Sequence, residues 1–224
     1  MTYVLIPGAG GAAWYWHRLV PVLGRLGHEA IAVDLPAADP KAGWSEYADA
    51  VVEAAAGRGE VIVVGQSMGG FTAPLVVDRL PVAGLILVNA MIPAPGETGS
   101  AWWADTDQES ARRANDERAG RDPDAGFDPL VYFFHDVPAD VTAEAVAGEP
   151  EQADTPFTQP WPLDAWPDVP TRVIAGRDDR LFPAAFQERV ARERLGVTAE
   201  LVPGGHLVAL SRPEELAAVV TPGF

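Results

Sequence analysis

Cysteine is absent from the 224-residue chain. Its absence excludes disulfide bonds, a thiol nucleophile and cysteine-ligated metals, and it fits a reducing compartment. Positive charge is also scarce, because 16 Lys and Arg residues face 32 Asp and Glu residues, for a formal net charge of -16. A surface with this charge repels phosphate backbones, so we expect no nucleic-acid partner.

Long apolar runs are missing as well. No uninterrupted apolar segment reaches the ~18 residues that a membrane span needs, so we expect no membrane association. The N-terminal sequence "MTYVLIPGAGG" has neither the charged start nor the long apolar core of a signal peptide. Together with the missing cysteine, this predicts a cytoplasmic protein.

The sequence does contain a regular alternation of short apolar runs and helical patterns. The apolar runs are nearly continuous, which is typical of strands covered on both faces, and the alternation predicts an α/β fold with a doubly wound, mainly parallel six-stranded sheet. Ser45 is expected to cap the second helix. The predicted strands are residues 3–7, 29–36, 60–65, 82–90, 171–176 and 198–204, and the predicted helices are residues 14–27, 45–56, 68–80, 183–195 and 213–220.

A segment of different composition interrupts this pattern after the fourth strand. Residues 93–169 are rich in proline, glycine and acidic residues, with aromatic residues interspersed. A disordered linker and a small helical cap are the two readings, and the aromatic content favours the cap, since disordered segments are usually poor in aromatics. We therefore expect a core of residues 1–92 and 170–224 and a cap, or lid, of residues 93–169.

The sequence "GQSMG" at residues 65–69 matches the pattern G-x-S-x-G between a predicted strand and a predicted helix. A chain that turns from strand to helix this sharply holds its apical residue in a strained conformation and needs small neighbours. Ser67 is that apical residue, and it would project beyond the carboxyl edge of the sheet, where open α/β sheets bind ligands.

A serine nucleophile needs a base, and the base needs an acid to orient it. His206 follows the last predicted strand and therefore opens at the same sheet edge as Ser67. The loop after the fifth strand offers Asp178 and Asp179 as the acid. The remaining histidines are better explained by surface, packing or cap roles, and they are His17, His28 and His135.

The elbow motif and the chain order Ser, Asp, His resemble the α/β-hydrolase family. The family's loop after this strand often reads G-x-x-D-x-x-x-P, which Gly176, Asp179 and Pro183 match, so the resemblance favours Asp179 over Asp178. It implies a triad of Ser67, His206 and Asp179 that works without a metal or a cofactor.

The resemblance also implies an oxyanion hole made of two backbone N–H groups. One belongs to Met68, and the other to Ala9 in the loop "PGAGGAAW", where Pro7 replaces the family's usual histidine. The same loop resembles the nucleotide-binding pattern G-x-G-x-x-A, with Asp34 at about the distance of a ribose-binding acid. A nucleotide-dependent enzyme is therefore a competing hypothesis, although a lone glycine motif is weak.

Residues 14–36 are similar to the matching stretch of plant methyl-salicylate esterases, hydroxynitrile lyases and related bacterial esterases. The lyases carry a threonine and a lysine where this chain has Gly8 and Leu207, so the resemblance favours ester hydrolysis. Gly8 and Leu207 are therefore expected at the substrate site. Three cap aromatics, Trp102, Trp103 and Phe134, are candidates to line it, but cap-to-core packing explains them equally well.

The expected function is hydrolysis of a small, largely apolar carboxylic ester through an acyl-enzyme, with the ester as the only small-molecule partner. A lyase and a ligand-binding or receptor-like protein with an idle triad stay open as alternatives. The sequence also leaves the oligomeric state open, a homodimer included.

Overall fold

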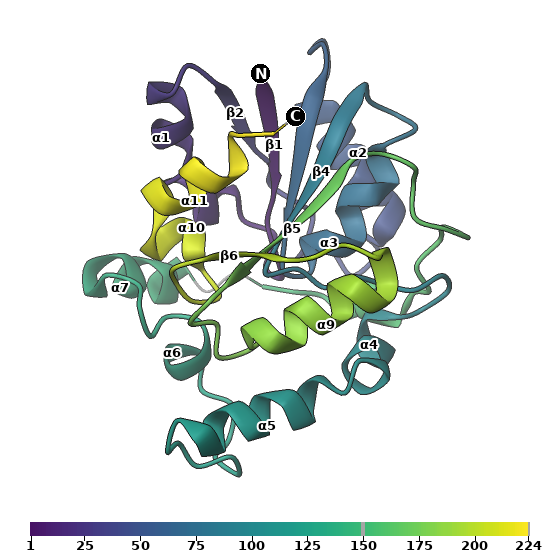
Figure 1. The fold of residues 1–224 in the computed structure, drawn as a ribbon. Helices are drawn as coiled ribbons and strands as arrows, with labels where there is room; N and C mark the ends of the chain where they lie inside the picture. Colours follow the sequence, from purple (N-terminus) through teal and green to yellow (C-terminus); the bar gives the residue numbers. More distant parts are fainter. Residues whose placement is uncertain (149–150, 224) are drawn as a thin grey trace.

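The computed structural model describes residues 1–148 and 151–223 and contains one six-stranded sheet (Figure 1). The strand order is β2-β1-β3-β4-β5-β6, and every pairing is parallel. This confirms the predicted doubly wound α/β fold. The strands are β1 (Thr2–Ile6), β2 (Glu29–Ala32), β3 (Val61–Gln66), β4 (Val82–Val88), β5 (Thr171–Gly176) and β6 (Glu200–Val202).

The central strands are apolar throughout because both of their faces are covered. Alternate residues of β3 belong to two different cores: Val61 and Val63 pack on one face, and Ile62 and Val64 on the other. All six residues of β3 are buried. The strand that leads to Ser67 is therefore held rigidly in the middle of the sheet.

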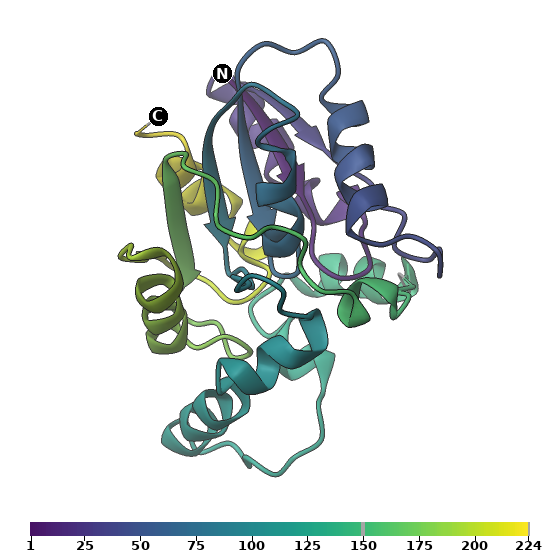
Figure 2. The ribbon, with the colours of Figure 1, turned by 90° about the vertical axis from the view of Figure 1, so that its right-hand side faces the viewer.

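Helices cover the sheet on both sides (Figures 1 and 2). The face with Ile62 packs against α1 (Val20–Arg25), α10 (Val208–Ser211) and α11 (Pro213–Val220). The face with Val63 packs against α2 (Trp44–Ala54), α3 (Gly69–Thr72) and α9 (Ala184–Leu195). The short 3-10 helices η1 (Ala13–Trp16) and η2 (Ala73–Val76) complete the two layers.

Two of the predicted helices are broken where proline occurs. The helix expected at residues 14–27 is divided into η1 and α1, and Pro21 lies in the first turn of α1. The helix expected at residues 68–80 is divided into α3 and η2, and Pro74 lies in the first turn of η2. Proline has no N–H to donate, so it starts a new helical segment more readily than it continues one.

The predicted N-cap of α2 is wrong. The helix begins at Trp44, so Ser45 lies inside it and Gly43 is the N-cap. The carboxylate of Glu46 accepts a hydrogen bond from the Gly43 N–H at 2.8 Å. This acidic side chain satisfies the free N–H at the helix start, and a serine cap is not needed.

Residues 93–169 form short helices below the carboxyl ends of the strands (Figure 1). Buried aromatic side chains, among them Trp102, Tyr132 and Trp161, attach this segment to the rest of the molecule. Its position is the one that a cap over the sheet edge would take, and the division into core and cap stays a prediction, with residues 149 and 150 outside the described residues. The helices are α4 (Gly99–Asp105), α5 (Gln108–Arg118), α6 (Pro129–Tyr132), α7 (Ala139–Gly148) and α8 (Thr155–Thr158).

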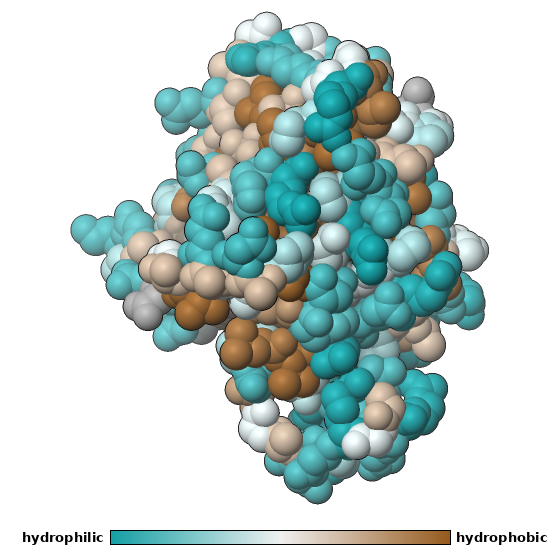
Figure 3. Space-filling model, turned by 90° about the vertical axis from the view of Figure 1, so that its left-hand side faces the viewer, coloured by the Kyte–Doolittle hydropathy of each residue, from teal (hydrophilic) through white to brown (hydrophobic). Residues whose placement is uncertain are grey.

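The surface seen in Figure 3 is mostly hydrophilic, with scattered apolar residues between the polar ones. Among residues 1–148 and 151–223, no helix combines the length and the apolar character that crossing a bilayer requires.

Candidate active site

Ser67 occupies the sharp turn between β3 and α3. Its φ angle is 52°, in the left-handed region that non-glycine residues rarely adopt. The strand ends at Gln66 and the helix begins at Gly69, so Met68 is the helix N-cap. The backbone strain at Ser67 is the feature that the motif predicts for an apical nucleophile.

The glycines on either side of Ser67 are required by close backbone contacts. A β-carbon on Gly65 would lie 2.6 Å from the Gly69 carbonyl oxygen, and one on Gly69 would lie 2.7 Å from the Pro7 carbonyl oxygen. Both distances are far below van der Waals contact. The turn therefore closes only with glycine at these two positions.

Three side chains from distant parts of the sequence meet at the carboxyl edge of the sheet. His206 Nε2 lies 3.1 Å from Ser67 Oγ, and His206 Nδ1 lies 2.8 Å from Asp179 Oδ2. His206 and Asp179 are buried, whereas Ser67 is partly exposed. An ionised carboxylate can only accept, so the proton of the ring lies on Nδ1 and leaves Nε2 free to accept from the serine hydroxyl.

Asp179, and not Asp178, faces His206. The second oxygen of Asp179 accepts from the N–H groups of Leu181 and Phe182 at 2.9 and 2.8 Å, which fixes the carboxylate. Asp178 is exposed and accepts instead from the Gly204 N–H at 3.1 Å. Both acids thus contact the loop that carries His206, and only Asp179 reaches the imidazole.

The loop that carries His206 is braced by Asn89, a residue that the sequence analysis did not single out. Asn89 is fully buried with a φ angle of 46°, and its amide nitrogen donates to the carbonyls of Gly205 and His206 at 3.0 Å each. Its amide oxygen accepts from the Gly176 N–H at 2.6 Å. Nothing in the sequence distinguishes this asparagine from an ordinary turn residue after a strand.

A small cavity of about 80 Å³ opens beside Ser67. Gly8, Phe134 and Leu207, three of the predicted substrate-site residues, line it together with Ser67 and His206. The remaining lining residues are Ala9, Tyr15, Gln66 and Phe133. The cavity is thus narrow and mostly apolar, with the serine hydroxyl and the imidazole as its reactive polar groups.

Tyr15 is a lining residue that the sequence analysis missed. Burial raises the pKa of its phenol above the ordinary value of 10.0, so the hydroxyl stays protonated at neutral pH. A protonated phenol in an apolar pocket is a hydrogen-bond donor for a bound ligand.

Ala9 and Met68 are the two residues whose backbone N–H groups are predicted to form an oxyanion hole. Ala9 lines the cavity, and Met68 follows Ser67 directly. Within the described residues neither backbone N–H has a hydrogen-bond acceptor. Two unengaged donors beside a nucleophile can stabilise a developing negative charge on a substrate oxygen.

Trp102 and Trp103 do not line this cavity, so the structure favours packing for both. The indole N–H of Trp102 donates to the Ile92 carbonyl at 3.1 Å, and its ring packs against Phe182 at a centroid distance of 5.2 Å. Trp103 contacts the same Phe182 ring at 5.7 Å.

The glycine-rich loop after β1 lacks the environment of a nucleotide site. Asp34, the proposed ribose-binding acid, accepts from the Ala13 N–H at 2.7 Å and so anchors η1. The Gly10 N–H donates to the Gln152 side chain at 2.9 Å. The loop leads into a four-residue 3-10 helix, which presents no long helix dipole to a pyrophosphate.

His17 and His28 lie in surface or packing positions, as expected. His17 is exposed, with its ring tilted against that of Trp14 at a centroid distance of 4.5 Å, and the ring of His28 meets Tyr3 edge-on at 5.3 Å.

Comparison with known proteins identifies the class to which this fold and site belong. The family model described as "Alpha/beta hydrolase family" matches residues 3–219. The chain therefore belongs to the α/β-hydrolase family.

Particular relatives are named for two different reactions. The chain is 36% identical over 108 residues to "Probable esterase PIR7A" of rice (Oryza sativa subsp. indica), and the match covers 42% of this chain and 41% of that protein. It is 34% identical over 103 residues to "Alpha-hydroxynitrile lyase" of Arabidopsis thaliana, covering 41% of this chain and 40% of that protein. The chain thus matches about two fifths of the length of each.

A solved structure covers nearly the whole chain. The pyrethroid hydrolase from Sphingobium faniae superposes with a TM-score of 0.73 at 24% identity, covering 98% of this chain and 95% of that chain. At this identity the likeness shows the fold alone.

Proposed function

We propose that the protein is a serine hydrolase that cleaves a small, largely apolar carboxylic ester through an acyl-enzyme. The observation that carries the proposal is the unbroken hydrogen-bonded series from Ser67 Oγ to His206 to Asp179, at 3.1 and 2.8 Å. The strained serine and the adjacent cavity support the same role.

In the proposed reaction, His206 Nε2 accepts the hydroxyl proton while Ser67 Oγ attacks the ester carbonyl carbon. The carbonyl oxygen becomes an oxyanion between the N–H groups of Ala9 and Met68. His206 then gives its proton to the departing alcohol, which leaves an acyl group on Ser67. A water molecule, activated by the same imidazole, releases the carboxylic acid. Asp179 stays ionised throughout and stabilises the imidazolium.

The cavity volume limits the substrate in its immediate contact with Ser67. About 80 Å³ is less than the ~150 Å³ of a cavity that holds a benzene ring. A short acyl or alkoxy group therefore fits beside the serine, and the rest of the substrate extends toward the cap. Phe133 and Phe134 supply apolar contact from the segment between residues 93 and 169.

Hydrolysis, and not cyanohydrin cleavage, is the reaction that the residues around His206 support. Leu207 lines the cavity and is neutral, so it cannot accept the charge of a leaving cyanide. Gly8 brings no hydroxyl to the other side of the cavity. One relative is named an esterase and another a hydroxynitrile lyase, so the choice rests on these two residues.

The first test replaces Ser67 with alanine and measures the hydrolysis of p-nitrophenyl acetate. We expect turnover to vanish, while the circular dichroism spectrum and the thermal midpoint stay close to those of the wild type. Undiminished turnover by Ser67→Ala would rule out the triad. A wild-type protein that cleaves mandelonitrile but no ester would instead point to the lyase.

A further inference from the structure

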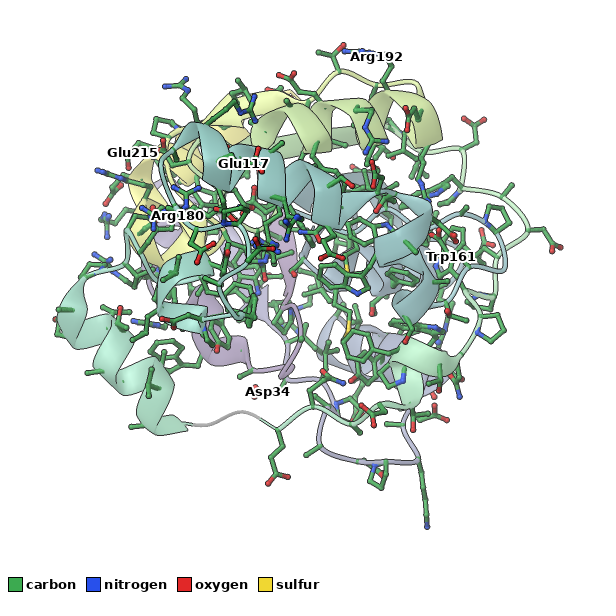
Figure 4. The ribbon with its side chains drawn as sticks, turned by 90° about the horizontal axis from the view of Figure 1, so that it is seen from below. Asp34, Glu117, Trp161, Arg180, Arg192 and Glu215 are labelled. Carbon is green, nitrogen blue, oxygen red and sulfur yellow. The ribbon has the colours of Figure 1, made fainter. Side chains whose placement is uncertain are left out.

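A second and larger cavity has Asp179, but not Ser67, in its lining. Its volume is about 420 Å³, and its lining comes from the end of α5, the segment after α6, the loop after β5, the start of α9 and the residue between α10 and α11. Figure 4, viewed from the cap side, shows Arg180 beneath the end of α5 that carries Glu117. Exposed lining residues such as Arg177 connect the cavity to solvent.

Positive charge is concentrated in this cavity. The chain has only 16 Lys and Arg residues against 32 acids, yet four arginines line this one space. They are Arg121, Arg177, Arg180 and Arg212. The pKa of Arg180 is lowered first by burial and then by the charge of Arg121, while the charges of Asp116, Asp136 and Asp178 raise it. A cluster of arginines is stabilised when an anion lies between them.

Three aspartates share the lining, but they are engaged elsewhere. Asp136 accepts from the Gly205 N–H at 2.7 Å, Asp178 from the Gly204 N–H at 3.1 Å, and Asp179 from His206. Within the described residues, none of the three is hydrogen-bonded to any of the four arginines. The guanidinium donors of the cavity are therefore left to other acceptors, among them Asp116 and the Val131 carbonyl.

The unengaged donors can be named. Arg121 Nη2 is buried and has no partner, while its Nε is held by Asp116. The Arg177 side chain has no acceptor in the described part of the chain, and Arg180 makes only a 3.3 Å bond to the Val131 carbonyl. Buried polar atoms are normally hydrogen-bonded, so the unpartnered and buried Arg121 Nη2 beside this cavity indicates a missing acceptor.

We propose that this cavity binds a small oxyanion, a phosphate or a carboxylate group, held by Arg121, Arg177 and Arg180. One buried acceptor, Asp136 Oδ1, also lacks a partner, and a hydroxyl such as that of hydrogen phosphate would satisfy it. A metal ion is not the better occupant, because the described residues contain no group of His, Asp and Glu side chains arranged to hold one. The proposal does not depend on ester hydrolysis.

Isothermal titration calorimetry tests it with potassium phosphate and sodium acetate, each at an ionic strength kept constant with chloride. We expect saturable binding of at least one of the two anions to the wild-type protein by about 10 mM, which is tenfold above a Kd of about 1 mM. The double variant Arg177→Gln/Arg180→Gln should bind at least about tenfold more weakly, since it loses two charged donors.

Arg79→Gln is the control for the substitution type, because it replaces one arginine of an exposed ion pair with Asp49, away from the cavity. It should change the affinity by less than about twofold. A stronger response to phosphate or to acetate identifies which group the cavity prefers. Absence of saturable binding of both anions, or equal affinity in the double variant and the wild type, would overturn the proposal. Calorimetry needs no turnover, so this result is independent of Ser67.

Discussion

At the scale of single residues, the active site requires a residue without a β-carbon next to the nucleophile. Gly8 lies so close to the nucleophile that a β-carbon there would stand 2.8 Å from the Ser67 β-carbon and 2.9 Å from the Gln66 side-chain oxygen. Ser67 cannot move away freely, because its backbone is already strained at a φ angle of 52°.

Gly8→Ala should therefore lower kcat/KM by about 10²-fold, since a displacement of about 1 Å is enough to cost that much. Steady-state hydrolysis of p-nitrophenyl acetate measures it. The control is Gly24→Ala in α1, where an added methyl group meets nothing within 4 Å. It should keep full activity and raise the unfolding free energy by about 0.5–1 kcal/mol. Equal activity of both variants would contradict the close contact at Gly8.

Asp179 offers a sharper test of the hydrogen-bond direction. In Asp179→Asn, an amide N–H facing His206 Nδ1 would favour the tautomer whose Nε2 carries the proton and cannot accept from Ser67. We expect kcat to fall by about 10⁴-fold with little change in stability. Asp178→Asn, the exposed neighbour, should keep most of its activity. A smaller loss at position 179 than at position 178 would reassign the acid.

At the scale of elements, the loop carrying His206 is held from several directions. Asn89 follows β4, Gln66 ends β3 and donates to the His206 carbonyl at 3.3 Å, and Asp178 follows β5. Asp136 is the brace that comes from residues 93–169, through its 2.7 Å bond to the Gly205 N–H. This bond joins the segment below the sheet to the catalytic base.

Asp136→Ala should loosen this loop. We expect kcat to fall by about tenfold with KM little changed, and the unfolding free energy to drop by about 1 kcal/mol, the usual contribution of one such hydrogen bond. Steady-state kinetics and urea unfolding measure the two effects. Asp164→Ala, at an exposed position of the same segment, should alter neither. Unchanged kcat in Asp136→Ala would show that the loop needs no brace from this side.

Sequence reasoning located the strands well and the helices less well. Runs such as residues 61–65 and 173–176 are apolar, and their shortness and β-branched residues favour a covered strand over a helix. Pro21 and Pro74 divided two helices that periodicity alone would continue. The short helices of residues 93–169 could not be placed, because tertiary contacts such as the Trp161 N–H to the Phe71 carbonyl at 3.0 Å hold them.

The residues of the candidate site could be predicted where a sequence motif fixes the backbone. They could not be predicted where only tertiary packing brings a side chain to the site. Ser67 and His206 follow from the elbow and from the position of one loop, the resemblance to the family's loop pattern selects Asp179 over Asp178, and the structure brings the three side chains together. Asn89 and Tyr15 carry no such signal, because an asparagine after a strand and a tyrosine in an aromatic stretch are common. Trp102 shows the opposite error, since its ring lies in the core.

At the scale of the whole molecule, an ion pair at the edge of the sheet joins β5 to β6, which are far apart in the sequence. Arg172 in β5 donates to both carboxylate oxygens of Glu200 in β6, at 2.7 and 2.8 Å. The hydrogen bonds from Arg172 lower the pKa of Glu200 below its ordinary value of 4.5. Because the folded-state pKa is the lower one, this pair stabilises the protein above pH 4.5, and the contribution is lost as the pH falls through the folded-state value.

Glu200→Gln should therefore lower the unfolding free energy at pH 7 by at most about 1 kcal/mol, since the pair is partly exposed to solvent. The difference from the wild type should shrink as the pH falls below 4.5. Urea unfolding between pH 7 and pH 3.5 measures it. Glu60→Gln, at an exposed position without an ion pair in the described residues, is the control for the loss of one negative charge. A difference that grows toward low pH would contradict the assignment.

The central claim is that Ser67 becomes covalently acylated, and mass spectrometry tests it most directly. The intact protein is treated with a fluorophosphonate that reacts with activated serines, then digested and sequenced. The account predicts one adduct per chain on Ser67, formed far more slowly in Asp179→Asn and absent from Ser67→Ala. An unmodified Ser67, or an adduct on another residue with Ser67 untouched, would contradict it.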